Sequence, residues 1–105
     1  MNRSFHIHPA VYNDIVRAKL YYESLGIPIP AGFEENIEGQ LRFISNFPDV
    51  GGKLFNSYRR QFIPRSVYLL AYRVNNDSID VLALLHGRRK PRSNKDILNG
   101  RQEQE

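Results

Sequence analysis

Two apolar, β-rich runs in the second half of the chain most constrain its fold. They span Val67–Val74 and Ile79–Leu85, and Asn75-Asn76-Asp77-Ser78 lies between them. Because Asn, Asp and Ser side chains bond their own backbone and tolerate left-handed dihedrals, this spacing predicts a β-hairpin. The second run has no polar residue from Val81 to Leu85. A strand that is apolar on both faces belongs at the centre of a covered sheet, so we expect the other elements to pack around this hairpin.

Two stretches in the first half have the apolar periodicity of amphipathic helices. The first follows Pro9, which suits the first turn of a helix, and is expected to end at Gly26. The second begins near Ala31 and ends at Phe47-Pro48. Each stretch places apolar residues three or four positions apart, namely Val11, Ile15, Ala18, Tyr22 and Leu25 in the first and Phe33, Ile37, Leu41 and Ile44 in the second. The short connection predicts an antiparallel helix hairpin with one side on the sheet.

The remaining pattern completes an α+β fold. Arg3–His8 alternates apolar and polar residues and is expected to be a short strand, as is Tyr58–Ile63. The predicted order is strand, helix, helix, strand, strand, strand, with the helix hairpin packed on a small, mainly antiparallel four-stranded sheet. At 105 residues the chain is expected to hold one domain, residues 1–92, followed by a polar, mobile tail, residues 93–105.

Several classes of site are disfavoured by composition. The chain has no Cys, so it cannot form disulfides or thiolate metal sites, and its only soft ligands are His6, His8 and His86. His6 and His8 are interpreted as exposed polar residues of the first strand, so we expect no metal and no cofactor. No run has the length of a signal peptide or a membrane span, which predicts a cytoplasmic protein without membrane contact.

Basic charge is concentrated in the sheet half of the chain. Residues 53–101 carry eleven cations and three acids, a net charge of +8, whereas residues 1–52 carry four cations and six acids, a net charge of −2. This polarity favours a polyanionic or acidic partner and salt-sensitive binding, although it could serve solubility alone. The arginines could also form weak surface ion pairs with Glu34, Glu35 or Glu38.

The second apolar run ends in His86-Gly87-Arg88-Arg89-Lys90-Pro91, which brings one histidine and three cations to a single point. His86 could act as a general acid or base, or it could cap the core by bonding nearby backbone groups. Several motifs occur together in a fixed order along the chain: Tyr21-Tyr22-Glu23, Leu25-Gly26, Phe33 with the 41–44 stripe and Phe47-Pro48, Arg59-Arg60, Tyr68–Val74, and Val81–Pro91. With this ordered set of motifs, the chain resembles the RelE/ParE superfamily of bacterial toxins over roughly residues 5–92.

That resemblance implies a toxin of a type II toxin–antitoxin module, which inhibits growth, can stabilise plasmids, and forms an oligomer with its cognate antitoxin. We favour the ParE-like branch, which poisons DNA gyrase without being a known nuclease. The alternative is the RelE-like branch, which cleaves mRNA on the ribosome without a metal, and in that case His86 and Arg88 would be catalytic. Two departures weigh against it, since Leu69 stands where RelE-like nucleases tend to carry Arg, and no Tyr or His follows His86. A second alternative is a basic nucleic-acid-binding module without toxicity.

The candidate binding residues combine the two basic clusters with nearby cations and one tyrosine. We predict that they contact the target or the antitoxin: Tyr58, Arg59, Arg60, Arg65, Arg73, Arg88, Arg89, Lys90 and Arg92.

Overall fold

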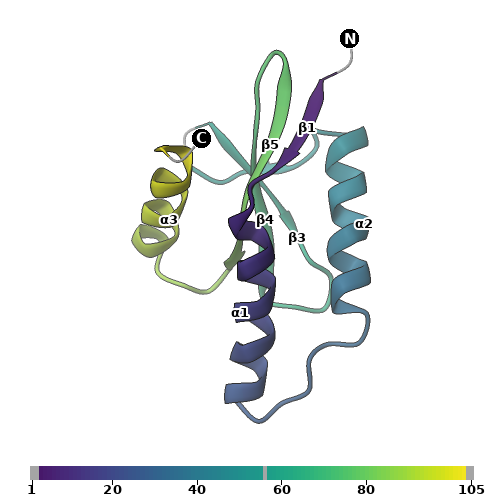
Figure 1. The fold of residues 1–105 in the computed structure, drawn as a ribbon, viewed down its shortest axis with the longest axis vertical. Coiled ribbons are helices and arrows are strands. Elements are labelled where there is room, and N and C mark those ends of the chain that lie inside the picture. The colour runs from purple at the N-terminus through teal and green to yellow at the C-terminus, as the bar shows by residue number, and fades with distance from the viewer. Residues whose placement is uncertain (1–2, 56, 104–105) are drawn as a thin grey trace.

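The computed structural model describes residues 3–55 and 57–103, which form one five-stranded mixed sheet with three helices (Figure 1). The elements are β1 (Ser4–Ile7), α1 (Ala10–Ser24), α2 (Phe33–Asn46), β2 (Gly52–Lys53), β3 (Tyr58–Phe62), β4 (Tyr68–Val74), β5 (Ser78–His86) and α3 (Pro91–Glu103). The predicted α+β class is confirmed. The predicted count of four strands is wrong, because Gly52 and Lys53 pair with β3 as an additional short edge strand.

The predicted hairpin forms the centre of the sheet. The strand order is β1-β5-β4-β3-β2, so β5 lies between β4, which is antiparallel to it, and β1, which is parallel to it. The pairing of β4 with β5 shifts register between Ala71 and Tyr72, which leaves Leu82 as the extra residue of a β-bulge. The bulge turns Val81 and Leu84 to one face and Leu82 and Ala83 to the other, so both faces of β5 are buried.

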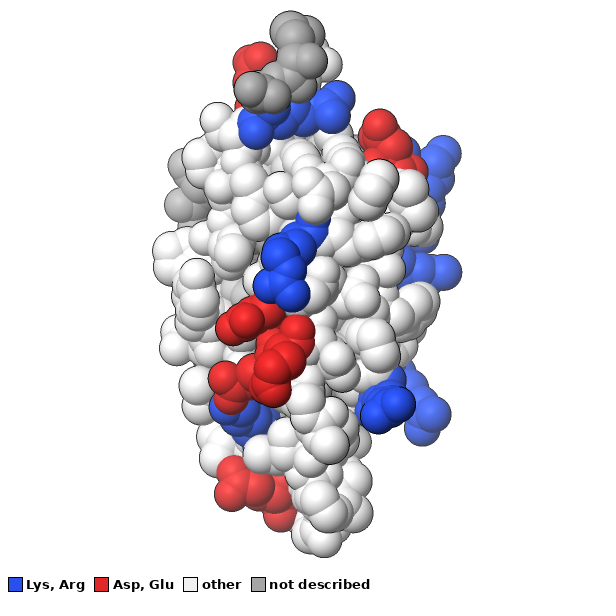
Figure 2. Space-filling model, turned by 90° about the vertical axis from the view of Figure 1, so that its right-hand side faces the viewer, with Lys and Arg blue, Asp and Glu red and all other residues white. Residues whose placement is uncertain are grey.

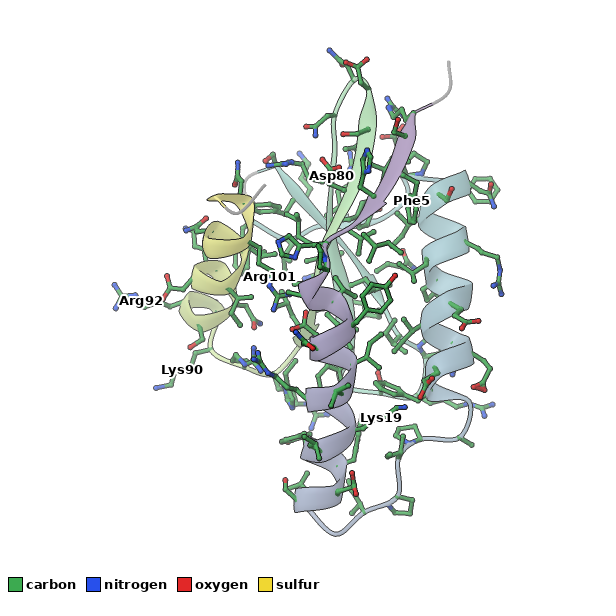
Figure 3. All side chains as sticks on the ribbon, in the orientation of Figure 1. Phe5, Lys19, Asp80, Lys90, Arg92 and Arg101 are labelled. Carbon is green, nitrogen blue, oxygen red and sulfur yellow. The ribbon has the colours of Figure 1, made fainter. Side chains whose placement is uncertain are left out.

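The predicted helix hairpin covers one face of the sheet. α1 and α2 run antiparallel, and they meet near their connection, where the rings of Tyr22 and Phe33 are 5.9 Å apart and Lys19 forms an ion pair with Glu34 (Figures 1 and 3). Because α1 presents Val11, Ala18 and Tyr22 to β4 and β5, the larger apolar core lies between these layers. Its buried members are Val11, Ala18, Tyr22, Phe33, Ile37, Ile44, Ile63, Tyr68, Leu70, Tyr72, Ile79, Val81 and Leu84.

The other face of the sheet is covered by α3, which lies on the opposite side of the molecule from α2 (Figure 1). The sequence predicted a mobile tail over residues 93–105; its residues 93–103 belong to α3, and residues 104–105 lie outside the described residues. Leu98 is fully buried and Ile97 is half-buried against a second core that also contains Tyr58, Leu69, Ala71, Leu82, Ala83 and Leu85. Over the described residues, no helix combines the length and apolar character needed to cross a membrane.

Candidate binding surface at the end of the sheet

The chain between the end of β5 and the start of α3 forms a turn that carries half of the predicted cations, namely Arg88, Arg89, Lys90 and Arg92. We call residues 86–92 the basic turn. Its backbone is fixed by hydrogen bonds from Gly87 N–H to the Val67 carbonyl (2.7 Å), from Arg88 N–H to Nδ1 of His86 (3.1 Å) and from Arg89 N–H to the His86 carbonyl (3.1 Å). A Cβ at position 87 would lie 2.9 Å from the Val67 carbonyl oxygen, so this close approach requires glycine.

The cations at this end of the sheet are not neutralised by acids. Arg65, Arg88, Arg89, Lys90 and Arg92 are all exposed, and within residues 3–55 and 57–103 none of them forms an ion pair. Lys90 and Arg92 project outward beside the start of α3 (Figure 3). The acids proposed as their partners lie elsewhere, because acidic side chains gather on the outer face of α2 (Figure 2), and Glu34 pairs with Lys19. These cations are therefore available to an anionic partner.

A half-exposed aromatic side chain adjoins these cations. Phe62, at the end of β3, is 53% exposed, and the Arg60 guanidinium lies 5.3 Å from the centre of its ring. A shallow pocket of about 190 Å³ lies between Phe62, Ser66, Val67, Gly87 and Arg88. An exposed ring beside unpaired guanidinium groups can contact both apolar and anionic groups of a partner.

The turn between β3 and β4 holds Arg65 in an uncommon conformation. Arg65 has φ 61°, in the left-handed region that non-glycine residues rarely adopt. The following Ser66 fixes this turn, because its Oγ donates to the Ile63 carbonyl (3.0 Å) and accepts from Tyr68 N–H (3.0 Å). The hydrogen bonds of Ser66 therefore hold Arg65 in this strained conformation, which sets the direction in which the Arg65 side chain leaves the backbone.

His86 packs against the rings of Tyr21 and Tyr68, which also contact each other. Its ring centre is 4.9 Å from that of Tyr21 and 5.3 Å from that of Tyr68, both edge to face. Burial, with a smaller contribution from Arg89 and Arg88, lowers the pKa of His86 below its ordinary 6.5. Burial also raises the pKa of Tyr68 to about 12. At neutral pH both side chains are therefore uncharged, and because Nδ1 of His86 accepts the Arg88 N–H, the hydrogen-bond pattern assigns the ring proton to Nε2.

Three of the predicted binding residues bond to other parts of the same chain. Tyr58 is 4% exposed beneath α3, and its hydroxyl donates to Gln102. The Arg59 guanidinium donates to the carbonyls of residues 49 (3.2 Å) and 51 (2.8 Å) and so holds the loop before β2. Arg73 lies 3.5 Å from Asp80, near the hairpin turn between β4 and β5 and far along the sheet from the basic turn. The sequence did not reveal these roles, because each depends on a partner from another element.

Residues of α3 that the sequence analysis overlooked support the basic turn. Asn94 is 5% exposed, and its amide donates to the His86 carbonyl (3.1 Å) and accepts from the Arg89 guanidinium (3.4 Å). Asn94, Leu98 and Arg101 fall at spacings of four and three on one face of α3, but only Leu98 is apolar, so no apolar periodicity indicated this helix.

A separate surface pocket, of about 470 Å³, lies where β1 meets β5. Its lining includes His6, His8, Ser78 and Asp80. His8 Nδ1 accepts the Ala10 N–H (3.0 Å), and the Asp80 carboxylate accepts from Asn75 (2.9 Å) and Ser78 (3.1 Å). In the part of the chain that the structure describes, no group of three or more His, Asp and Glu side chains could hold a metal ion.

Comparisons with known proteins identify first a shared fold and then a protein family. A solved structure titled "Chromosomal ParDE TA system from P. aeruginosa" shares the fold, with a TM-score of 0.60 at 15% identity over 80% of this chain and 95% of that chain. This likeness shows that the two chains have the same fold. Residues 5–91 match the family described as "ParE toxin of type II toxin-antitoxin system, parDE", and the chain belongs to that family. It is also similar to proteins named Toxin ParE2 in two strains of Mycobacterium tuberculosis, with 28% identity over 102 residues, 96% of this chain and 97% of each relative.

Proposed function

We propose that this ParE-family toxin inhibits growth by poisoning DNA gyrase, and that the end of the sheet around the basic turn contacts the target. The observation that carries this proposal is the set of exposed, unpaired cations beside the half-exposed Phe62. Gyrase holds DNA during its reaction, so a complex of enzyme and DNA offers the anionic surface that such a cluster fits. Membership of the ParE family supports the same target class.

The surroundings of His86 favour binding over RNA cleavage. Metal-free cleavage needs a base for the 2′-hydroxyl and an acid for the leaving oxygen. The lowered pKa of His86 disfavours the imidazolium form that would act as the acid, and the raised pKa of Tyr68, about 12, makes its hydroxyl a poor proton donor. Nδ1 of His86 is also engaged by the Arg88 N–H. These features support a structural role for His86 in building the basic turn.

A second exposed surface, on α1, fits a protein partner. We propose that a protein antitoxin covers the outer face of α1, where Tyr12, Val16 and Leu20 are 60%, 55% and 56% exposed. They lie four residues apart on one side of the helix, opposite the buried Val11, Ala18 and Tyr22, so α1 is apolar on both sides. Exposed apolar faces of this kind mark protein interfaces. The ParDE title of the structural relative supports an antitoxin as the occupant, in an oligomeric complex.

The proposal is tested with the toxin freed from its antitoxin. The protein is added in parallel to a gyrase supercoiling and cleavage reaction and to a translating ribosome extract in which breaks in the message are mapped. We expect trapped, cleaved DNA and intact message. Message cleaved on the ribosome with gyrase unaffected would establish the RelE-like alternative, and absence of growth arrest on expression would favour the non-toxic nucleic-acid-binding module.

A further inference from the structure

Asp14 is a buried carboxylate that the proposed function does not use. It is 7% exposed and lies on the face of α1 that otherwise contributes Val11, Ala18 and Tyr22 to the core. A carboxylate in such a place is retained only when its charge and its lone pairs are satisfied. Its partners therefore indicate what it does.

The partners of Asp14 come from β5 and from α3. Arg101 donates to both carboxylate oxygens, to Oδ1 through Nη2 at 2.6 Å and to Oδ2 through Nη1. Oδ2 also accepts the Leu84 N–H at 3.0 Å, and Nη1 of Arg101 donates to the Leu82 carbonyl at 3.0 Å. One ion pair therefore connects α1, β5 and α3, although its two residues are 87 positions apart in sequence.

The ion pair fills a gap in the hydrogen bonding of β5. The parallel partner β1 ends at Ile7, and the last bond on that side of β5 runs from His8 N–H to the Val81 carbonyl (2.8 Å). Beyond this point the β5 edge would leave the Leu82 carbonyl and the Leu84 N–H without a strand partner. Asp14 and Arg101 replace the missing strand, since one accepts from Leu84 and the other donates to Leu82.

Polar contacts such as this ion pair are needed to hold α3, because the helix contributes little apolar surface to the core. Among the described residues of α3, Leu98 is the only fully buried apolar side chain, and Ile97 is half-buried. A 13-residue helix is not stable by itself in water, and two apolar side chains offset only part of the entropy lost when it is ordered. The bidentate contact of Arg101 with Asp14, together with the bond from the Tyr58 hydroxyl to Gln102, therefore anchors α3 on the sheet.

Holding α3 in place also fixes the basic turn. Asn94, about two turns before Arg101 on the same face of α3, bonds the His86 carbonyl and the Arg89 guanidinium. We propose that Asp14 and Arg101 are positioning residues for the basic turn, acting through α3 and Asn94 to set the direction of its cations. This inference rests on the proposed function only in assigning the basic turn to target contact.

Amide hydrogen exchange by NMR tests the positioning role without any target. Arg101→Gln removes the ion pair, and Lys95→Gln is the matched control because it removes one exposed cation from the same helix. Asn94→Ala breaks the connection to the basic turn while leaving Arg101 and Asp14 in contact. We expect exchange of the Arg88 and Arg89 amides to rise about tenfold or more in Arg101→Gln and in Asn94→Ala, and to stay unchanged in Lys95→Gln.

Exchange of the α3 amides distinguishes the two steps of the proposed connection, which are the anchoring of α3 by Arg101 and the bonding of the basic turn by Asn94. They should exchange faster in Arg101→Gln and remain protected in Asn94→Ala. Unchanged exchange of the basic-turn amides in Asn94→Ala would overturn the inference, and that variant keeps the test decisive if Arg101→Gln does not fold. Gyrase cleavage is then measured with Asn94→Ala. If the basic-turn amides of Asn94→Ala exchange faster but the variant still poisons gyrase fully, the positioning role is supported and the proposed contact of the basic turn with the target is contradicted.

Discussion

Gly51 should not tolerate a side chain, whereas its neighbour Gly52 should. A Cβ at Gly51 would overlap the hydroxyl of Tyr72 and would lie 2.8 Å from the backbone carbonyl oxygen of Arg60. A Cβ at Gly52 would have its nearest neighbour at 3.5 Å, in the Arg60 side chain, which is an ordinary contact. Gly51→Ala therefore tests how the loop before β2 is held against the sheet, and Gly52→Ala is its matched control.

The cost of Gly51→Ala follows from what surrounds the added methyl group. Tyr72 is fully buried, and its hydroxyl donates to the Pro48 carbonyl at 2.8 Å, so the ring cannot move without losing this bond or core packing. The Arg60 carbonyl belongs to the backbone of β3, where Arg60 pairs with Ala71. Overpacking costs about 1–3 kcal/mol and the lost hydrogen bond about 1 kcal/mol, so we expect a loss of about 2–4 kcal/mol. In a domain of this size, this lowers Tm by roughly 10 °C or more.

Urea and thermal unfolding of the two variants measure this difference. Gly52→Ala should stay within about 0.5 kcal/mol of the wild type. Tyr72→Phe removes the overlapping hydroxyl, so Tyr72→Phe combined with Gly51→Ala should cost less than the sum of the two single changes. Equal stability of Gly51→Ala and Gly52→Ala would refute the described packing of this loop against Tyr72.

Four further predictions concern single residues. Arg59→Ala should lower the free energy of unfolding by about 1.5–3 kcal/mol, measured in urea, because its guanidinium donates to two loop carbonyls. Arg65→Gly should relieve a positive φ and raise stability by about 1 kcal/mol while weakening gyrase poisoning, and a less stable variant would contradict the strain. Leu20→Asp should weaken antitoxin binding measured by calorimetry and leave Tm within a few degrees of the wild type, because Leu20 is exposed. The wild type should lose stability as pH falls below 6.5, because the pKa of His86 is lowered in the folded state and the unfolded chain therefore binds more protons there. Urea unfolding at pH 7.5 and 5.5 measures this loss, which should be smaller for His86→Asn.

The sequence predicted the elements whose signals are local. The hairpin of β4 and β5 carries its own turn residues and apolar strands, and the two helices repeat apolar residues along one stripe, so the pattern alone identified them. The basic turn was also predictable, because its cations are consecutive in sequence. α3 was missed because it has only two adjacent apolar residues, and its main anchor, Arg101, pairs with a residue at the other end of the chain.

Other features depend on contacts that no local pattern encodes. The apolar run of β5 has no alternation, so the bulge at Leu82 left no trace in the sequence. β2 consists of a glycine and a lysine, which individually favour turns and surfaces more than strands. Arg59 and Arg60 are adjacent and chemically identical, yet one binds backbone carbonyls and the other lies over Phe62. Which arginine is available to a partner was therefore set by the fold.

We propose that the protein acts by binding through the basic turn and not by proton transfer at His86. The most direct measurement compares DNA cleavage by gyrase in the presence of the wild type, the Arg88→Ala/Arg89→Ala double variant and His86→Asn. Asparagine places an acceptor near the position of Nδ1, so it can keep the Arg88 N–H bond while removing the imidazole. We expect the wild type and His86→Asn to trap cleaved DNA, and the folded double variant to lose most of this activity. An inactive but folded His86→Asn beside a fully active double variant would contradict the claim.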